Sequence, residues 1–219
     1  AVVEISTEPR LHSSLNQCSM NFMRHILLLL CVLLSGYAKE SSAASHEIIR
    51  GESFLNYYVT VNGASTNGSF TDYTMDINFA PSVPEESYVT GEVRLSRKTI
   101  TALYDEVAKG IVTSDWLDVD KYPKATFNFK NFELSTPNNY KGHGTLTLLG
   151  KTLPIECSLI LNTRQDGTVV ADATVLVDRI EYGIGRGEWE ETSTIHNIVT
   201  VHAHLITRPT ASKTPPKQY

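Results

Sequence analysis

Three histidines near the C-terminal end of the chain could do chemistry, because imidazole nitrogens bind metals and exchange protons near neutral pH. His202 and His204 are separated by one residue, so in a strand both side chains lie on one face, and His196 points the same way. A metal ion would need a third converging ligand, and this face is opposite the apolar face of the segment. The pattern favours solvent-facing histidines, and a metal-dependent enzyme that uses this cluster remains an alternative.

A glycine-rich segment, residues 182–189 (YGIGRGEW), has the composition of a phosphate-binding loop. It lacks the Lys-Ser/Thr ending of a P-loop and no helical pattern follows it, so we interpret it as a loop between two strands. The sequence contains no GxSxG, no HExxH and no GxGxxG after a strand, and spacing marks no pair of carboxylates as general acid and base. These observations favour a protein that is not an enzyme and uses no cofactor.

The composition excludes several classes of protein. The chain has 219 residues, a formal net charge of −5 and 41% hydrophobic residues, which is ordinary for a globular protein. An acidic chain lacks the basic surface that binds nucleic acid, so we expect no nucleic-acid partner. Three cysteines without a CxxC pair indicate neither a disulfide framework nor a zinc site. Cys157 lies in an alternating apolar stretch, which predicts a small buried side chain and not a reactive thiol.

The N-terminal part of the chain has the pattern of an export signal. Residues 26–34 form an apolar run of nine residues, the length of a signal-peptide core and well short of the roughly 20 residues that cross a bilayer. Arg24 precedes the run, and small residues offer cleavage after Ala38 or after Ala43. We therefore predict that residues 20–43 are a cleavable signal peptide.

The remaining segments complete the expected domain organisation. Residues 1–19 precede two candidate start methionines and are predicted to be an upstream extension without function. Residues 44–207 are predicted to form one domain. Residues 208–219 contain three prolines and no apolar period, which predicts a disordered tail.

The elements that must position these side chains are predicted to be strands. In residues 125–130 every second residue, starting with Ala125, is apolar, and the residues between them are polar. One apolar face per strand is typical of antiparallel sheets with one solvated side. The same period recurs in residues 155–161, 169–177 and 195–205.

Turn signals separate the apolar runs and predict a meander that closes as a barrel or a sandwich. The predicted turns are Asn62-Gly63, Asn67-Gly68, Pro137–Asn139, Gly150-Lys151 and Asp166-Gly167.

One segment has a helical period instead. Ile100, Leu103, Tyr104 and Val107 are spaced i, i+3, i+4 and i+7, which predicts an amphipathic helix over residues 98–109. Because it has a single apolar stripe, we expect this helix to lie across an open end of the barrel.

Four stretches, taken in order, resemble the YceI-like family. Residues 114–127 (SDWLDVDKYPKATF) resemble its central signature, and residues 144–155 (GTLTLLGKTLPI) resemble its G-x-L-T hairpin. Residues 178–189 (DRIEYGIGRGEW) are similar to its glycine-rich segment ending in Trp, and residues 53–55 together with residues 68–73 fit its first hairpin. The resemblance covers about residues 50–207. One departure is Arg50–Ser53, which stands where the family has an acidic-Pro-x-His-Ser opening.

The resemblance implies an all-β, lipocalin-like antiparallel barrel of about eight strands with one short helix near an open end. It also implies an exported, periplasmic binding protein that holds a polyisoprenoid, a quinone or a similar long apolar lipid, with no catalytic residues. The lipid is then a bound ligand and not a cofactor. Transient contact with a membrane is compatible with this function.

The inward apolar faces are the candidate ligand-binding residues, although core packing would produce the same pattern. A filled barrel that acts through interactions alone therefore remains an alternative to a carrier. Trp116 and Trp189 are expected to close the ends of the barrel or to pack at its corners. The residues expected to line a cavity are Phe127, Phe129, Leu146, Leu148, Ile155, Leu159 and Val201.

Overall fold

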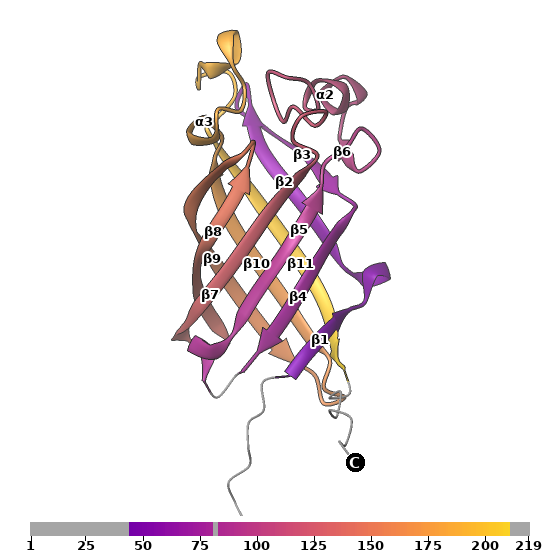
Figure 1. The fold of residues 1–219 in the computed structure, drawn as a ribbon, viewed down its shortest axis with the longest axis vertical. Helices are drawn as coiled ribbons and strands as arrows, with labels where there is room; N and C mark the ends of the chain where they lie inside the picture. Colours follow the sequence, from indigo (N-terminus) through magenta and orange to yellow (C-terminus); the bar gives the residue numbers. More distant parts are fainter. Residues whose placement is uncertain (1–43, 81–82, 211–219) are drawn as a thin grey trace, which may run out of the picture. The chain divides into compact units, whose positions relative to one another are not determined.

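The computed structural model describes residues 44–80 and 83–210, which form an antiparallel β-barrel (Figure 1). The strands are β1 (Ala44–Ile48), β2 (Phe54–Val61), β3 (Ala64–Phe70), β4 (Tyr73–Phe79), β5 (Tyr88–Arg94), β6 (Ile100–Ala102), β7 (Lys124–Thr136), β8 (Asn139–Leu148), β9 (Lys151–Thr163), β10 (Val169–Asp178) and β11 (Ile198–Pro209). The helical turns are η1 (Arg50–Glu52), η2 (Pro84–Glu86), α2 (Asp105–Gly110), α3 (Arg179–Tyr182) and η3 (Gly187–Glu190).

Strand pairing closes the sheet on itself. Strands β4, β5, β7, β8, β9, β10 and β11 pair in that order, each antiparallel to the next. β1 pairs with both β4 and β11. After η1, β2 continues along β11 and also pairs with β3. The segments β1 and β2 therefore act as one interrupted strand of the barrel, and β3 and β4 act as another. The prediction of an all-β, lipocalin-like barrel of eight antiparallel strands is therefore confirmed.

The period-two pattern decides which side chains face the interior. Along β10, Val169, Ala171, Ala173, Val175 and Val177 all face inward, as the alternation predicts. Ala171, Ala173 and Val175 have apolar partners on both adjoining strands, because antiparallel partners lie on the same face of the sheet.

Most predicted turns are confirmed, and one is wrong. Asn62 and Gly63 both have positive φ, 50° and 76°, as a two-residue hairpin turn requires. The turns at 137–139, 150–151 and 166–167 also join successive strands. Asn67-Gly68, in contrast, lies inside β3. Gly68 is needed there because a Cβ atom would collide with the Thr101 carbonyl and the Tyr57 ring.

The helix predicted over residues 98–109 is wrong in its extent. Residues 100–102 form β6, which pairs with β3, and the helix α2 begins only at Asp105. Ile100 is 3% exposed within this strand pair, whereas Leu103 is 58% exposed and Tyr104 60% exposed. The four apolar residues therefore share no face. The expected position at one end of the barrel holds, since α2 and α3 both lie there (Figure 1).

Three predicted segments fall partly or wholly outside the described residues. The upstream extension (residues 1–19) and the signal peptide (residues 20–43) lie wholly outside them, and so do residues 211–219 of the predicted tail. Arg208 and Pro209, which the sequence assigns to the tail, belong to β11 and pair with β1. No helix within residues 44–80 and 83–210 is long and apolar enough to cross a membrane.

Candidate binding cavity

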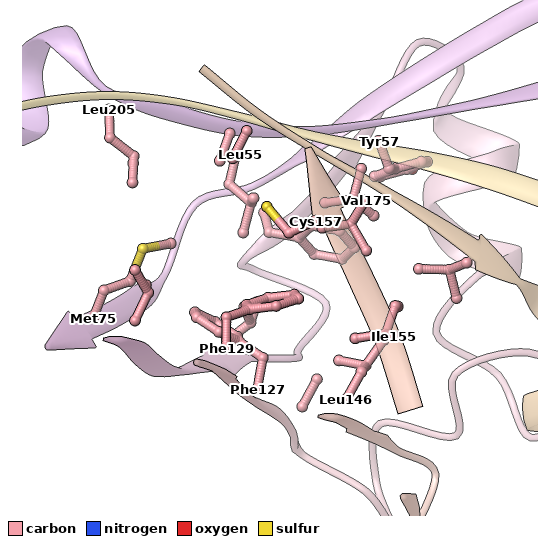
Figure 2. Close-up of a pocket in the computed structure, with 18 of the residues that line it drawn as sticks. Leu55, Tyr57, Met75, Phe127, Phe129, Leu146, Ile155, Cys157, Val175 and Leu205 are labelled. Atoms are coloured by element: carbon pink, nitrogen blue, oxygen red, sulfur yellow. The ribbon is translucent and has the colours of Figure 1, made fainter. Parts of the chain in front are cut away.

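The barrel encloses a cavity of about 260 Å³. Its wall is almost wholly apolar, because the inward faces of the strands contribute aliphatic, aromatic and sulfur-containing side chains (Figure 2). Among the described residues no Asp, Glu or Lys lines it. Such a space suits an apolar ligand and offers little to a charged one.

The structure places all seven predicted lining residues on this wall. Phe127 and Phe129 extend from β7 with ring centroids 6.1 Å apart, and Ile155 faces them from β9 in the close-up (Figure 2). That these side chains contact a ligand stays a prediction. The seven are Phe127, Phe129, Leu146, Leu148, Ile155, Leu159 and Val201.

Small residues on one side of the barrel leave the room for the cavity. Ala173 on β10 pairs with Ala203 on β11, and both face inward, as does Ala171. An eight-stranded barrel is normally just filled by its side chains, so alanines at these positions open a space that larger residues would occupy.

Sequence reasoning missed the part of the wall that comes from the N-terminal strands. Leu55 and Tyr57 on β2 and Met75 and Ile77 on β4 also line the cavity. The alternation that marks inward-facing residues was present in the sequence, because the two members of each pair are separated by one residue, as a strand with one apolar face requires.

Two loops close the end of the barrel that bears α2 and α3, here called the helix end. Trp116 packs against Trp189 with ring centroids 6.0 Å apart, and Trp116 also lines the cavity. The backbone N–H groups of Gly185 and Arg186 both donate to the Asp115 carbonyl, at 2.8 and 3.0 Å, which joins the loops. The two tryptophans therefore pack together at one end and do not close opposite ends.

Arg179 holds the second of these loops in place. Its side chain is 1% exposed and donates to the backbone carbonyls of Ile184, Ile195 and His196 at 3.0, 2.8 and 3.1 Å. Burial lowers the pKa of the guanidinium, and the charge of Asp178 opposes that shift. The positive φ angles of the loop glycines, from 66° to 76°, allow the chain to fold around this side chain. The segment thus belongs to the connection between β10 and β11, as predicted.

The opposite end, here called the β1 end, holds the polar side chains that line the cavity far from the loops. His46 Nδ1 lies 3.1 Å from Thr207 Oγ1. Ser87 Oγ accepts the backbone N–H of Ala80 at 3.0 Å. Burial lowers the pKa of His46, so its imidazole is neutral at neutral pH.

Cys157 behaves as the small buried side chain that was predicted. It lies on the cavity wall, and burial raises the pKa of its thiol to about 12. A thiol that stays protonated at neutral pH is a poor nucleophile.

The histidine cluster lies on the outer face of the barrel. His204 Nδ1 is 2.7 Å and His202 Nε2 3.5 Å from the same Asp172 oxygen, and Phe54 stacks on His204. His196 does not share this face, because it precedes β11 and its Nδ1 accepts the backbone N–H of Ile198. Within the described ranges, no group of three or more ligating side chains could hold a metal ion.

The sequence matches the family model described as the YceI-like domain over residues 43–206. A UPF0312 protein of Azotobacter vinelandii is 30% identical over 103 residues, which cover 47% of this chain and 53% of that protein. A UPF0312 protein of Pseudomonas putida is 28% identical over 128 residues, covering 57% and 66%. The chain thus spans about half to two thirds of the length of these curated relatives.

Solved structures share the fold. BcnA of Burkholderia cenocepacia superposes with a TM-score of 0.68 at 21% identity, covering 73% of this chain and 99% of that chain. A polyisoprenoid binding domain from Saccharophagus degradans superposes with a TM-score of 0.54 at 14% identity, covering 77% and 99%.

Proposed function

Because the chain belongs to the YceI-like family, we propose that it is a binding protein that carries a polyisoprenoid or a similar long apolar lipid in its barrel. The observation that supports this most strongly is the apolar cavity between Phe127, Ile155 and Ala173. Burying apolar ligand surface against such a wall contributes about 25 cal/mol per Å² before the entropic cost of binding is subtracted.

The size of the cavity suggests a slender ligand. An apolar cavity of roughly 150 Å³ holds one benzene molecule, so a cavity of about 260 Å³ has room for a slender chain and not for a bulky ring system. A prenyl alcohol or a prenylated quinone is therefore the ligand class that we propose.

The described part of the chain also supports a carrier more than an enzyme. The titratable side chains that line the cavity are His46, Tyr57, Cys157 and Arg179. Burial raises the pKa values of Tyr57 and Cys157 to about 12, so neither ionises near neutral pH. The lipid would be cargo, and no catalytic step or cofactor is part of the proposal.

The proposal includes export to the periplasm, with residues 20–43 as the signal peptide. Its support is the short apolar run followed by small residues. N-terminal sequencing of protein recovered from the periplasm of expressing bacteria tests it. A terminus next to Ala38 or Ala43 supports export, and retention of residues 20–43 in the cytoplasm contradicts it.

Native mass spectrometry of protein purified in contact with bacterial membranes tests the carrier function. We expect a bound mass that disappears on denaturation and that belongs to a series spaced by isoprene units. A spectrum at the bare polypeptide mass, unchanged by added prenyl lipid, would contradict the proposal and favour a ligand-free barrel.

A further inference from the structure

The two ends of the cavity differ in polarity. At the helix end Trp116, Leu117 and Ile184 face the cavity, and Arg179, which also lines it, already donates to three backbone carbonyls. At the β1 end, His46, Ser87 and Thr207 face it. A ligand with one polar terminus and one apolar chain would therefore bind in a single orientation.

His46 offers an imidazole nitrogen that has no hydrogen-bond partner among the described residues. Its Nδ1 is hydrogen-bonded to the hydroxyl of Thr207, a residue that is 3% exposed. The same hydroxyl also lies 3.4 Å from the Val169 carbonyl oxygen. If Thr207 donates to Val169, Nδ1 carries the proton and Nε2 accepts. If Thr207 donates to His46, Nε2 carries the proton and donates. In either case Nε2 has no partner among the described residues, so it can bind a ligand oxygen.

Ser87 provides a second polar group at the same end. Ser87 is 2% exposed as a residue, and its hydroxyl accepts one hydrogen bond from the backbone N–H of Ala80, but within residues 44–80 and 83–210 no group accepts the hydroxyl proton. The strand register places His46 opposite Ile77 on β4, and Ser87 directly before the β5 residue that faces Asn78. The two side chains thus flank β4 on the inner face of the barrel.

Among the residues that the structure describes at this end, no buried charge matches an anionic ligand. The nearest charged pair on β1 and β11, Glu47 with Arg208, is 3.4 Å apart and exposed on the outer face. The buried cation of the cavity, Arg179, lies at the helix end, where three backbone carbonyls already accept its hydrogen bonds. A phosphate at the β1 end would lose its hydration without a compensating cation.

We infer that the β1 end binds the head group of the ligand through an uncharged hydroxyl or carbonyl oxygen, at His46 and Ser87, with the apolar chain directed toward Trp116. This inference rests on the proposed function and deepens it, because it selects prenyl alcohols and quinones over prenyl phosphates and plain hydrocarbons.

Competition binding tests the inference. Delipidated protein is mixed with equal amounts of geranylgeraniol, geranylgeranyl phosphate and a C20 isoprenoid hydrocarbon, and the bound fractions are read by native mass spectrometry. We expect the alcohol to exceed the hydrocarbon by up to about tenfold, the value of one hydrogen bond in an apolar site. A prenylated quinone with the same tail, tested separately, shows whether a carbonyl is also accepted.

Two variants make the test specific. His46→Phe keeps an aromatic ring but removes both nitrogens, and we expect it to bind alcohol and hydrocarbon within about twofold of each other. His143→Phe is the matched control, because His143 lies on the outer face beside Glu156, and it should keep the wild-type preference.

The possible outcomes are distinguishable. Equal binding of alcohol and hydrocarbon by the wild type, or a preference for the phosphate, would overturn the inference and leave the carrier function intact. An unchanged preference in His46→Phe would also overturn it. Binding of none of the lipids would overturn the proposed function itself.

Discussion

A large side chain placed on the alanine-lined side of the cavity distinguishes a hollow barrel from a packed one. Ala173 faces inward at the middle of β10, between Leu159 on β9 and Ala203 on β11. The substitution Ala173→Phe adds a phenyl ring, six heavy atoms, which takes up a large part of a cavity of about 260 Å³, since roughly 150 Å³ holds one benzene molecule. At about 0.3 kcal/mol per ligand atom displaced, the lost affinity is about 2 kcal/mol, or roughly thirtyfold.

The assay is a titration with geranylgeraniol together with urea denaturation. In a hollow barrel we expect weaker binding and an unchanged or increased free energy of unfolding, because the ring occupies empty space. Thr174→Phe, at the neighbouring position that faces outward beside His202, is the matched control and should leave binding unchanged. Unaltered binding together with a destabilisation of about 1–3 kcal/mol, the usual cost of overpacking, would show that the barrel is already filled at this position.

Three further predictions concern buried side chains. Burial lowers the pKa of His46 below the ordinary value of 6.5, so the unfolded chain takes up the proton first and the free energy of unfolding should fall as the pH drops below about 6.5. Urea denaturation at several pH values should show a smaller loss in His46→Phe than in the wild type. An equal loss in both proteins would contradict the assignment of this pH dependence to His46. Arg179→Met leaves three carbonyls without their donor, and we expect a loss of about 3 kcal/mol or more in urea denaturation, whereas a loss below 1 kcal/mol would show that Arg179 does not hold the loop. Cys157 should react with a thiol reagent only after denaturation, and rapid reaction of the folded protein would contradict its burial.

The strands could be predicted from the sequence because their signal is local. Alternation along residues 125–130 and 169–177 shows which face is apolar, and the Asn62-Gly63 pair indicates its own turn geometry. The helix over residues 98–109 could not be judged in this way. Its apolar spacing is compatible with a helix, and only the pairing of β6 with β3, far away in the sequence, makes residues 100–102 a strand.

The candidate site was partly predictable for the same reason. The sequence shows that Phe127 faces inward, but not that Ala173 and Ala203 lie side by side and leave a space. His46 carries no pattern at all, since a single histidine in an N-terminal strand has no periodic partner. Its role depends on the pairing of β1 with the C-terminal end of β11, which only the closed barrel brings about.

A crystal structure of the protein grown with saturating geranylgeraniol shows whether the barrel holds a lipid. We expect continuous ligand density inside the barrel, with the hydroxyl beside His46 and the chain passing Phe127 toward Trp116. A cavity that holds no lipid at saturation, with its side chains collapsed into the space, would contradict the claim that this barrel is a lipid carrier.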